Sequence, residues 1–208
     1  MDIRKNRSQL RRWYKELNWS IHRALAKEFF DKVALQARQD DFLDYLYVSI
    51  NANNSQIQIA SGSHPAGPQE VIFDQNGKQI SKRIPTEQGA TLVISQGGDG
   101  SVTVSLYPFH SEKMERKVPH IIWAVFADPA ELTESVLQDV TRDFFTYMKV
   151  SSVHFTESRC ERLRIQFLEL KGLRYAEGGG ILPFVVKNWA KEVIVIAGAV
   201  AGVLALLK

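Results

Sequence analysis

The chain has 208 residues, of which 45% are apolar and 24% are charged, and its formal net charge at pH 7 is +3. This length suits one globular domain with an appendage and excludes two full-sized domains. The composition excludes wholesale disorder and a membrane protein with many spans. Cys160 is the only cysteine, which excludes an internal disulfide framework and a cysteine-ligated metal site and indicates a reducing compartment.

The N-terminal part predicts one long amphipathic helix from Leu10 to Val33, which could lie across a sheet or pair with its own copy. The first forty residues hold ten Lys or Arg against five Asp or Glu, and Arg11 and Arg12 lie on the polar face. This basic excess suits a nucleic acid, a nucleotide-like ligand or an anionic lipid surface, and equally a solvated helix face. The apolar residues of the helix recur with a 3.6-residue period: Trp13, Tyr14, Leu17, Ile21, Leu25, Phe29 and Val33.

Alternating apolar and polar residues after position 44 predict an antiparallel sheet rich in hairpins. Turn-forming residues separate the members of each pair, including Asn76-Gly77, which supplies the positive φ angles of a tight turn. The three predicted strand pairs are 45–50 with 56–59, 71–73 with 79–81, and 91–95 with 102–107.

The third turn contains Gly97-Gly98-Asp99-Gly100-Ser101. This run resembles the Gly-Gly-Asp-Gly-Thr signature of NAD kinases and diacylglycerol kinases, where it lies between a strand and a helix. Residues 102–107 alternate as a strand instead, and the phosphate cradle of such motifs depends on a helix that follows. We therefore interpret this run as a hairpin turn.

Two more strands and one more helix are predicted after position 119. Residues 120–127 are apolar on both faces, which is typical of a central strand. Asp128, Pro129 and Glu131 supply an N-cap, a proline at the first position and an acid at the third position of a helix. Residues 162–167 alternate in polarity and predict a last strand.

Arg162 and Arg164 are two positions apart, so a strand would project both guanidinium groups from one face. Together with Arg11 and Arg12 they form the candidate ligand-binding set, because guanidinium groups can fork onto phosphate or carboxylate. The alternative is a solvent-facing strand edge protected by charge. The five histidines lack metal-ligand spacing, and we find no motif for catalysis or for a cofactor.

The C-terminal region predicts a membrane anchor. Gly178-Gly179-Gly180 forms a flexible joint. Residues 193–207 are fifteen consecutive residues without a charge or a polar side chain, and a helix counted from Trp189 covers roughly 28 Å, at the lower edge of a span. A buried core helix is the alternative, although the segment is apolar on every face. Small residues line one side of it and could support close packing of helices: Ala197, Gly198, Ala201, Gly202 and Ala205.

The predicted fold is therefore α+β, with a long N-terminal helix, a hairpin-rich antiparallel sheet, a second helix and a C-terminal transmembrane helix. The predicted division is a cytosolic domain at 1–177, a joint with an interfacial segment at 178–190, and a transmembrane helix at 191–208 of a bacterial inner membrane. Basic residues preceding the helix place the domain in the cytoplasm.

This layout of sensor domain, joint and short self-associating membrane helix resembles single-pass membrane effectors of bacterial antiphage defence, such as the ion-channel component of Hailong-type systems. The resemblance implies an oligomeric pore, without catalysis or a cofactor, that a nucleotide or oligonucleotide controls. The alternatives are a tail-anchored binding or scaffold protein and an enzyme held at the membrane.

Overall fold

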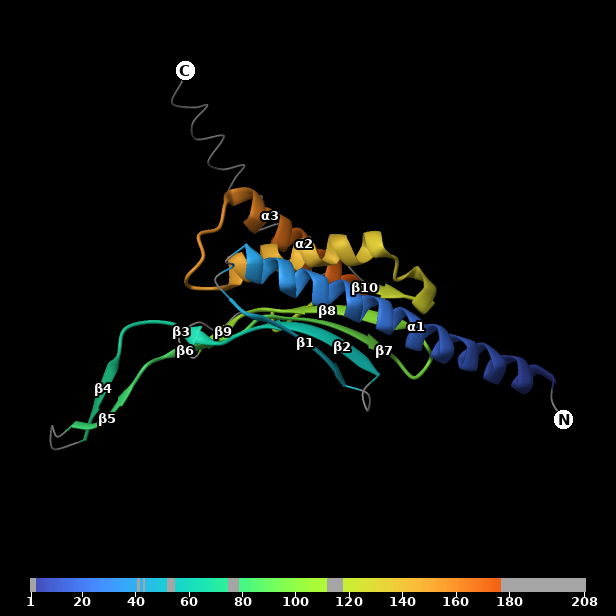
Figure 1. The fold of residues 1–208 in the computed structure, drawn as a ribbon, viewed down its shortest axis with the longest axis horizontal. Helices are drawn as coiled ribbons and strands as arrows, with labels where there is room; N and C mark the ends of the chain where they lie inside the picture. Colours follow the sequence, from blue (N-terminus) through green and yellow to red (C-terminus); the bar gives the residue numbers. More distant parts are fainter. Residues whose placement is uncertain are drawn as a thin grey trace, which may run out of the picture.

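The computed structural model describes residues 3–40, 42, 44–51, 55–74, 79–111 and 118–176. In this part the protein is a mixed α+β fold, with helices above an antiparallel sheet (Figure 1). The helices are α1 (Ile3–Gln39), the 3₁₀ turn η1 (Pro129–Glu131), α2 (Glu134–Ser151) and α3 (Arg159–Ala176). The segments at 178–190 and 191–208, with the five small residues of the predicted membrane helix, lie outside the described residues.

The main sheet has five antiparallel strands in the order β1-β2-β7-β8-β10. A small three-stranded sheet and a hairpin extend from one end of it (Figure 1). The main-sheet strands are β1 (Leu46–Asn51), β2 (Gln56–Ser61), β7 (Thr91–Gln96), β8 (Val102–Tyr107) and β10 (Ile121–Phe126). The other strands are β3 (His64–Pro65), β6 (Thr86–Gln88) and β9 (His110–Ser111), and the hairpin strands β4 (Glu70–Phe73) and β5 (Gln79–Arg83).

All three predicted hairpins are confirmed, because β1 pairs with β2, β4 with β5, and β7 with β8. In the β7–β8 turn the Gly97 amide donates to the Ser101 carbonyl at 2.8 Å, and Gly100 has a φ of 80°. A strand, β8, follows this turn. The interpretation as a hairpin turn is therefore correct, and the kinase-like phosphate cradle is not formed.

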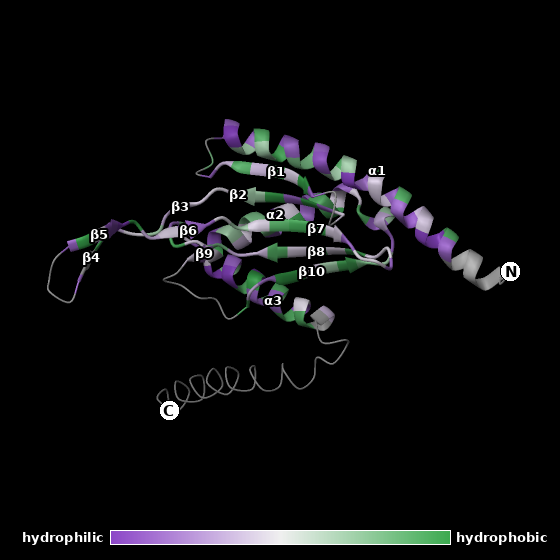
Figure 2. Ribbon diagram, turned by 90° about the horizontal axis from the view of Figure 1, so that it is seen from below, coloured by the Kyte–Doolittle hydropathy of each residue, from purple (hydrophilic) through white to green (hydrophobic). Residues whose placement is uncertain are grey.

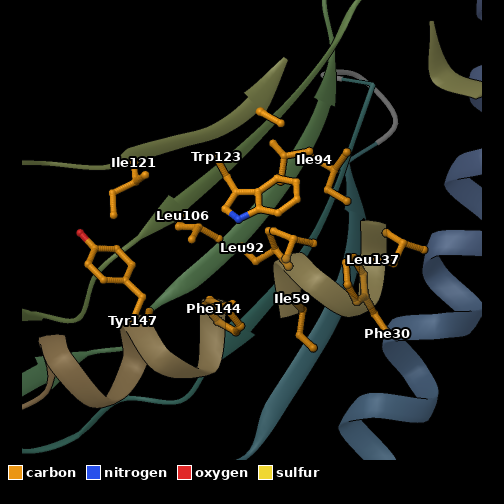
Figure 3. Close-up of a cluster of buried hydrophobic side chains, with 14 of the residues drawn as sticks. Phe30, Ile59, Leu92, Ile94, Leu106, Ile121, Trp123, Leu137, Phe144 and Tyr147 are labelled. Atoms are coloured by element: carbon orange, nitrogen blue, oxygen red, sulfur yellow. The ribbon is translucent and has the colours of Figure 1, made fainter. Parts of the chain in front are cut away.

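The core lies between the sheet and the helices (Figure 3). Alternate residues of the strands, such as Ile59 in β2 and Leu92 in β7, point to the same face and are fully buried. Phe144 of α2 and Phe30 of α1 cover them from the helix side. The apolar face of the sheet and the apolar faces of α1 and α2 therefore pack together in one layer.

The prediction that residues 120–127 form a central strand is wrong, because β10 is an edge of the main sheet. Helix α3 covers that edge, and a Cβ added at Gly172 would lie 3.1 Å from the Ile122 carbonyl oxygen and 3.2 Å from its amide nitrogen. This close approach explains why an edge strand can be apolar on both faces: a helix, rather than a neighbouring strand, protects it.

The prediction of a strand at 162–167 is also wrong, because these residues belong to α3. The side chains that α3 buries are Ile165 and Leu168, followed by Gly172, at helical rather than alternating spacing. Leu163 and Phe167, which complete the alternating pattern, are 64% and 59% exposed. Packing against β10 and α2 therefore selects the helix.

The helix predicted from Asp128 is confirmed with a change at its start. Asp128 caps a 3₁₀ turn through the predicted capping box with Glu131. Thr133 then provides a second N-cap, accepting from the Val136 amide, and α2 begins at Glu134. The apolar side chains of α2 lie in the core or against it, with Val140 fully buried.

Candidate functional site: a groove between α1 and α2

The four arginines predicted to bind a ligand do not form one site. Arg12 precedes Lys15, whose side chain lies against Gly100 in the β7–β8 turn at one end of the sheet. At the other end, past β8, the Phe109 amide donates to the Ser151 hydroxyl at the end of α2. The start of α3 lies there too, because Lys149 of α2 pairs with Glu161 of α3 at 3.2 Å. Arg11 and Arg12 are therefore at the opposite end from Arg162.

Arg164 is held in an ion pair with a buried carboxylate. Its Nε and Nη2 atoms donate to the two carboxylate oxygens of Asp143 at 2.9 and 2.8 Å. The Trp123 indole also donates to Asp143 at 2.8 Å, and Asp143 is only 2% exposed. The hydrogen bonds to Asp143 raise the pKa of Arg164 above its ordinary value. This fork therefore ties α3 to α2 and β10.

The other arginines of the set are on the surface. Arg12 pairs with Glu16 at 3.1 Å, and both side chains are more than half exposed. Arg162 pairs with Glu157 and is 62% exposed. Such pairs are easily replaced by an anionic ligand because exposed ion pairs contribute little free energy.

A groove of about 460 Å³ lies between α1 and α2. Aromatic rings, two cations and several short polar side chains line it. Thr141 is buried, and its hydroxyl has no hydrogen-bond partner within the part of the chain that the structure describes. The lining residues are Phe29, Gln138, Thr141, Arg142, Phe145, Thr146 and Lys149.

This combination can hold an anionic ligand that has a flat apolar part. The rings of Phe29 and Phe145 offer stacking surface, and the cations of Arg142 and Lys149 offer charge. Both cations have acidic partners that are themselves partly exposed, since Arg142 pairs with Asp139 at 2.8 Å and Lys149 with Glu161. An incoming phosphate could therefore replace those partners.

The groove was not among the sites predicted from the sequence, although the α2 sequence contains a pattern that indicates part of its lining. Gln138, Arg142, Phe145 and Lys149 recur at helical spacing on α2, beside the stripe that packs into the core. Their meeting with Phe29 of α1 is a tertiary contact. The period of the α2 sequence alone therefore could not reveal it.

A second cluster of titratable groups lies where β3 and β6 meet the end of α2. The His64 ring nitrogens lie 3.1 Å from Asp44 Oδ1 and 2.9 Å from Glu87 Oε2. Glu87, which is 1% exposed, also accepts from the Ser152 hydroxyl at 2.8 Å and from the Val153 amide.

This cluster joins four segments of the chain and does not have the arrangement of a catalytic triad. Both His64 nitrogens face carboxylates, and the Ser152 hydroxyl points to Glu87 rather than to the imidazole. The Ser152 hydroxyl is therefore not paired with an imidazole, as the nucleophile of a serine triad would be. Within the described ranges, no three His, Cys, Asp or Glu side chains are grouped so that they could hold a metal ion.

Comparison of the sequence with family models and with curated proteins, and of the fold with solved structures, finds no match. Among the helices within residues 3–176 that the structure describes, none is long and apolar enough to cross a bilayer.

Proposed function

We propose that this protein is a membrane-anchored oligomeric effector whose folded domain controls its C-terminal segment, as a ligand-controlled ion channel in bacterial defence would. The observation that carries the proposal is the uncharged apolar run at 193–207 with its stripe of small residues, which follows a folded α+β domain. A helix of this composition favours the bilayer, and its small residues favour close association with copies of itself.

The α1–α2 groove supports the ligand-controlled part of this proposal. Arg142 and Lys149 beside Phe29 and Phe145 suit a nucleotide or a short oligonucleotide, which combines phosphates with flat bases. The groove replaces the set of four arginines as our proposed ligand site, because those arginines are divided between two ends of the domain. In this proposal the cytosolic domain binds the ligand and the membrane helices respond.

The pore is tested by Gly198→Leu with Gly202→Leu in the full-length protein. Both substitutions keep the segment apolar, so the protein should still float with vesicles, while close helix packing and ion flux should be lost. Ala199→Leu with Val203→Leu is the matched control, because it adds bulk at the same spacing on another face of the helix. Equal flux from wild type and from the double glycine variant would contradict the pore.

The ligand site is tested by Arg142→Gln with Lys149→Gln. Binding of a nucleotide or an oligonucleotide should weaken, and the dependence of its affinity on salt should become shallower, because two phosphate contacts are removed. Arg162→Gln removes an exposed cation outside the groove and should leave affinity unchanged. Unchanged binding in the double variant would remove the groove from the proposal.

The second candidate function is a tail-anchored scaffold without pore activity. The exposed apolar side chains along α1 favour it, because they offer a contact surface outside the domain core. A protein that floats with vesicles but conducts under no ligand would support the scaffold over the channel.

A further inference from the structure

Helix α1 has two opposed apolar faces, and the described residues of the domain cover only one of them. Trp19, Ala26 and Phe30 are buried against the domain. Leu10 lies at about 180° from Trp19 around the helix axis if each residue turns the helix by about 100°, and it begins a second apolar stripe that faces solvent. The members of this exposed stripe are between 46% and 55% exposed: Leu10, Trp13, Tyr14, Leu17, Ile21 and Leu25.

The first part of the exposed stripe, from Leu10 to Tyr14, belongs to the part of α1 that projects from the domain. Leu17, Ile21 and Leu25 continue the stripe along the outer side of the helix, where the opposite side packs on the domain. Figures 1 and 2 show that the N-terminal end of this helix extends past the strands, with apolar residues interspersed among hydrophilic ones. Lys15 is already at the margin of the sheet, against the β7–β8 turn at Gly100. Within the part of the chain that the structure describes, the helix residues just before it, 9–14, are accordingly all exposed.

The same end of α1 carries a concentrated positive charge. Residues 3–15 hold six Lys or Arg and no Asp or Glu. Arg11 and Arg12 are both exposed, and Arg12 lies about 160° around the helix from Leu10. An apolar stripe with Trp and Leu opposite a basic face is the pattern of a helix that lies in a membrane interface.

We propose that the exposed stripe of α1, from Leu10 to Leu25, docks on the surface of an anionic lipid bilayer. The apolar stripe would enter the boundary between headgroups and acyl chains, where Trp13 and Tyr14 are favoured. The cations would attract anionic headgroups. This contact does not depend on whether the C-terminal segment crosses the bilayer, because α1 lies at the other end of the chain.

A lipid surface explains the observations better than a second copy of the chain or a nucleic acid. The stripe, from Leu10 to Leu25, is shorter than the three to four heptads typical of a coiled coil, which disfavours pairing with a second copy. A nucleic acid would use the cations but leaves Leu10, Leu17 and Ile21 unexplained, since phosphate contacts need no apolar stripe.

The proposal is tested with an environment-sensitive fluorophore on full-length protein. Cys160→Ser removes the exposed native thiol, and Leu17→Cys places the label on the stripe. Glu16→Cys is the matched control, because Glu16 is the adjacent residue, also exposed, on another side of the helix. The probes are vesicles of phosphatidylcholine alone or mixed with phosphatidylglycerol.

We expect a blue shift of the label at position 17 on vesicles that contain phosphatidylglycerol, and little shift at position 16. High salt should reverse the shift. Arg11→Gln with Arg12→Gln should weaken the affinity for these vesicles by about fivefold for each cation removed. Leu10→Gln with Ile21→Gln should abolish the shift without unfolding the domain, because both side chains are exposed.

Three results would overturn the proposal. The first is an unchanged spectrum at position 17 on anionic vesicles. The second is a shift that follows protein concentration without lipid, which would assign the stripe to a second copy. The third is a shift with an oligonucleotide but not with vesicles. Flotation with phosphatidylcholine vesicles reports on the C-terminal segment separately, so failure of the two proposals can be distinguished.

Discussion

The variant Arg164→Met distinguishes a structural role of this arginine from a role in binding a ligand. Its two hydrogen bonds reach an Asp143 side chain that is 3% exposed, whereas the Arg164 side chain is 44% exposed. Removing one partner of a fully buried pair costs about 3–5 kcal/mol. Because solvent screens the guanidinium, we reduce this to about 2 kcal/mol of unfolding free energy for Arg164→Met. In a domain of this size the melting temperature would fall by about 4–8 °C.

The matched control is Arg162→Met, which removes the same group two positions earlier. Arg162 is 62% exposed and its partner Glu157 is partly exposed, so the change in unfolding free energy should stay within about 0.5 kcal/mol. Urea unfolding of the full-length protein in mild detergent, followed by near-ultraviolet circular dichroism, measures both. Equal stability of the two variants would refute the structural role of the Arg164 pair.

Two further predictions concern α3. Gly172→Val should destabilise the protein by roughly 1–3 kcal/mol, because its side chain would press on the Ile122 backbone; Gly98→Ala, which meets no atom within 4 Å, is the control in the same thermal melt. Hydrogen bonds from Ser158 lower the pKa of Glu161, so its stabilising contribution is present above the ordinary pKa of about 4.5 and is lost as the pH falls through the lowered value. Glu161→Gln should therefore make the melting temperature fall less steeply as the pH is lowered below about 4.5. An unchanged fall of the melting temperature in this pH range would contradict the prediction.

The hairpins could be predicted because their signals are local. Alternation fixes which strand face is apolar, and turn residues between two alternating runs fix where the chain reverses. The β7–β8 hairpin has both signals, with Gly100 taking the positive φ that its turn requires. The position of β10 in the sheet is not a local property, since α3 covers the edge and its Gly172 lies fifty positions after Ile122.

Helix α3 was missed because two patterns overlap in one segment. Leu163, Ile165 and Phe167 alternate like a strand, whereas Ile165 and Leu168 share a helical face. A capping box preceding them could have decided the question: the Glu161 amide donates to the Ser158 hydroxyl at 3.2 Å, and the Ser158 amide donates to Glu161 at 2.8 Å. Ser-x-x-Glu before an apolar run is a start signal for a helix.

The sequence could predict which residue types would bind the ligand, but not which residues come together in the candidate site. Cations suited to an anionic ligand are visible in the sequence, but their partners are not, because Asp143 lies 21 positions before Arg164. The groove has the same difficulty, since Phe29 precedes Arg142 by more than one hundred residues. Contacts between such distant positions follow from the packing of α1 and α2, which no periodic pattern in either helix specifies.

Helix α1 shows why a correct period does not identify the buried face. The exposed stripe that includes Leu17 and Ile21 has the larger and more regular apolar side chains, and it predicts the helix correctly over 10–33. The face that packs on the domain instead combines the small residues Ala26 and Ala37 with the large rings of Trp19 and Phe30. Small residues let the helix backbone approach the strands, while two large rings fill the remaining space. The stripe of larger residues is therefore free for a contact outside the domain, and that availability makes the anionic-vesicle experiment informative about α1.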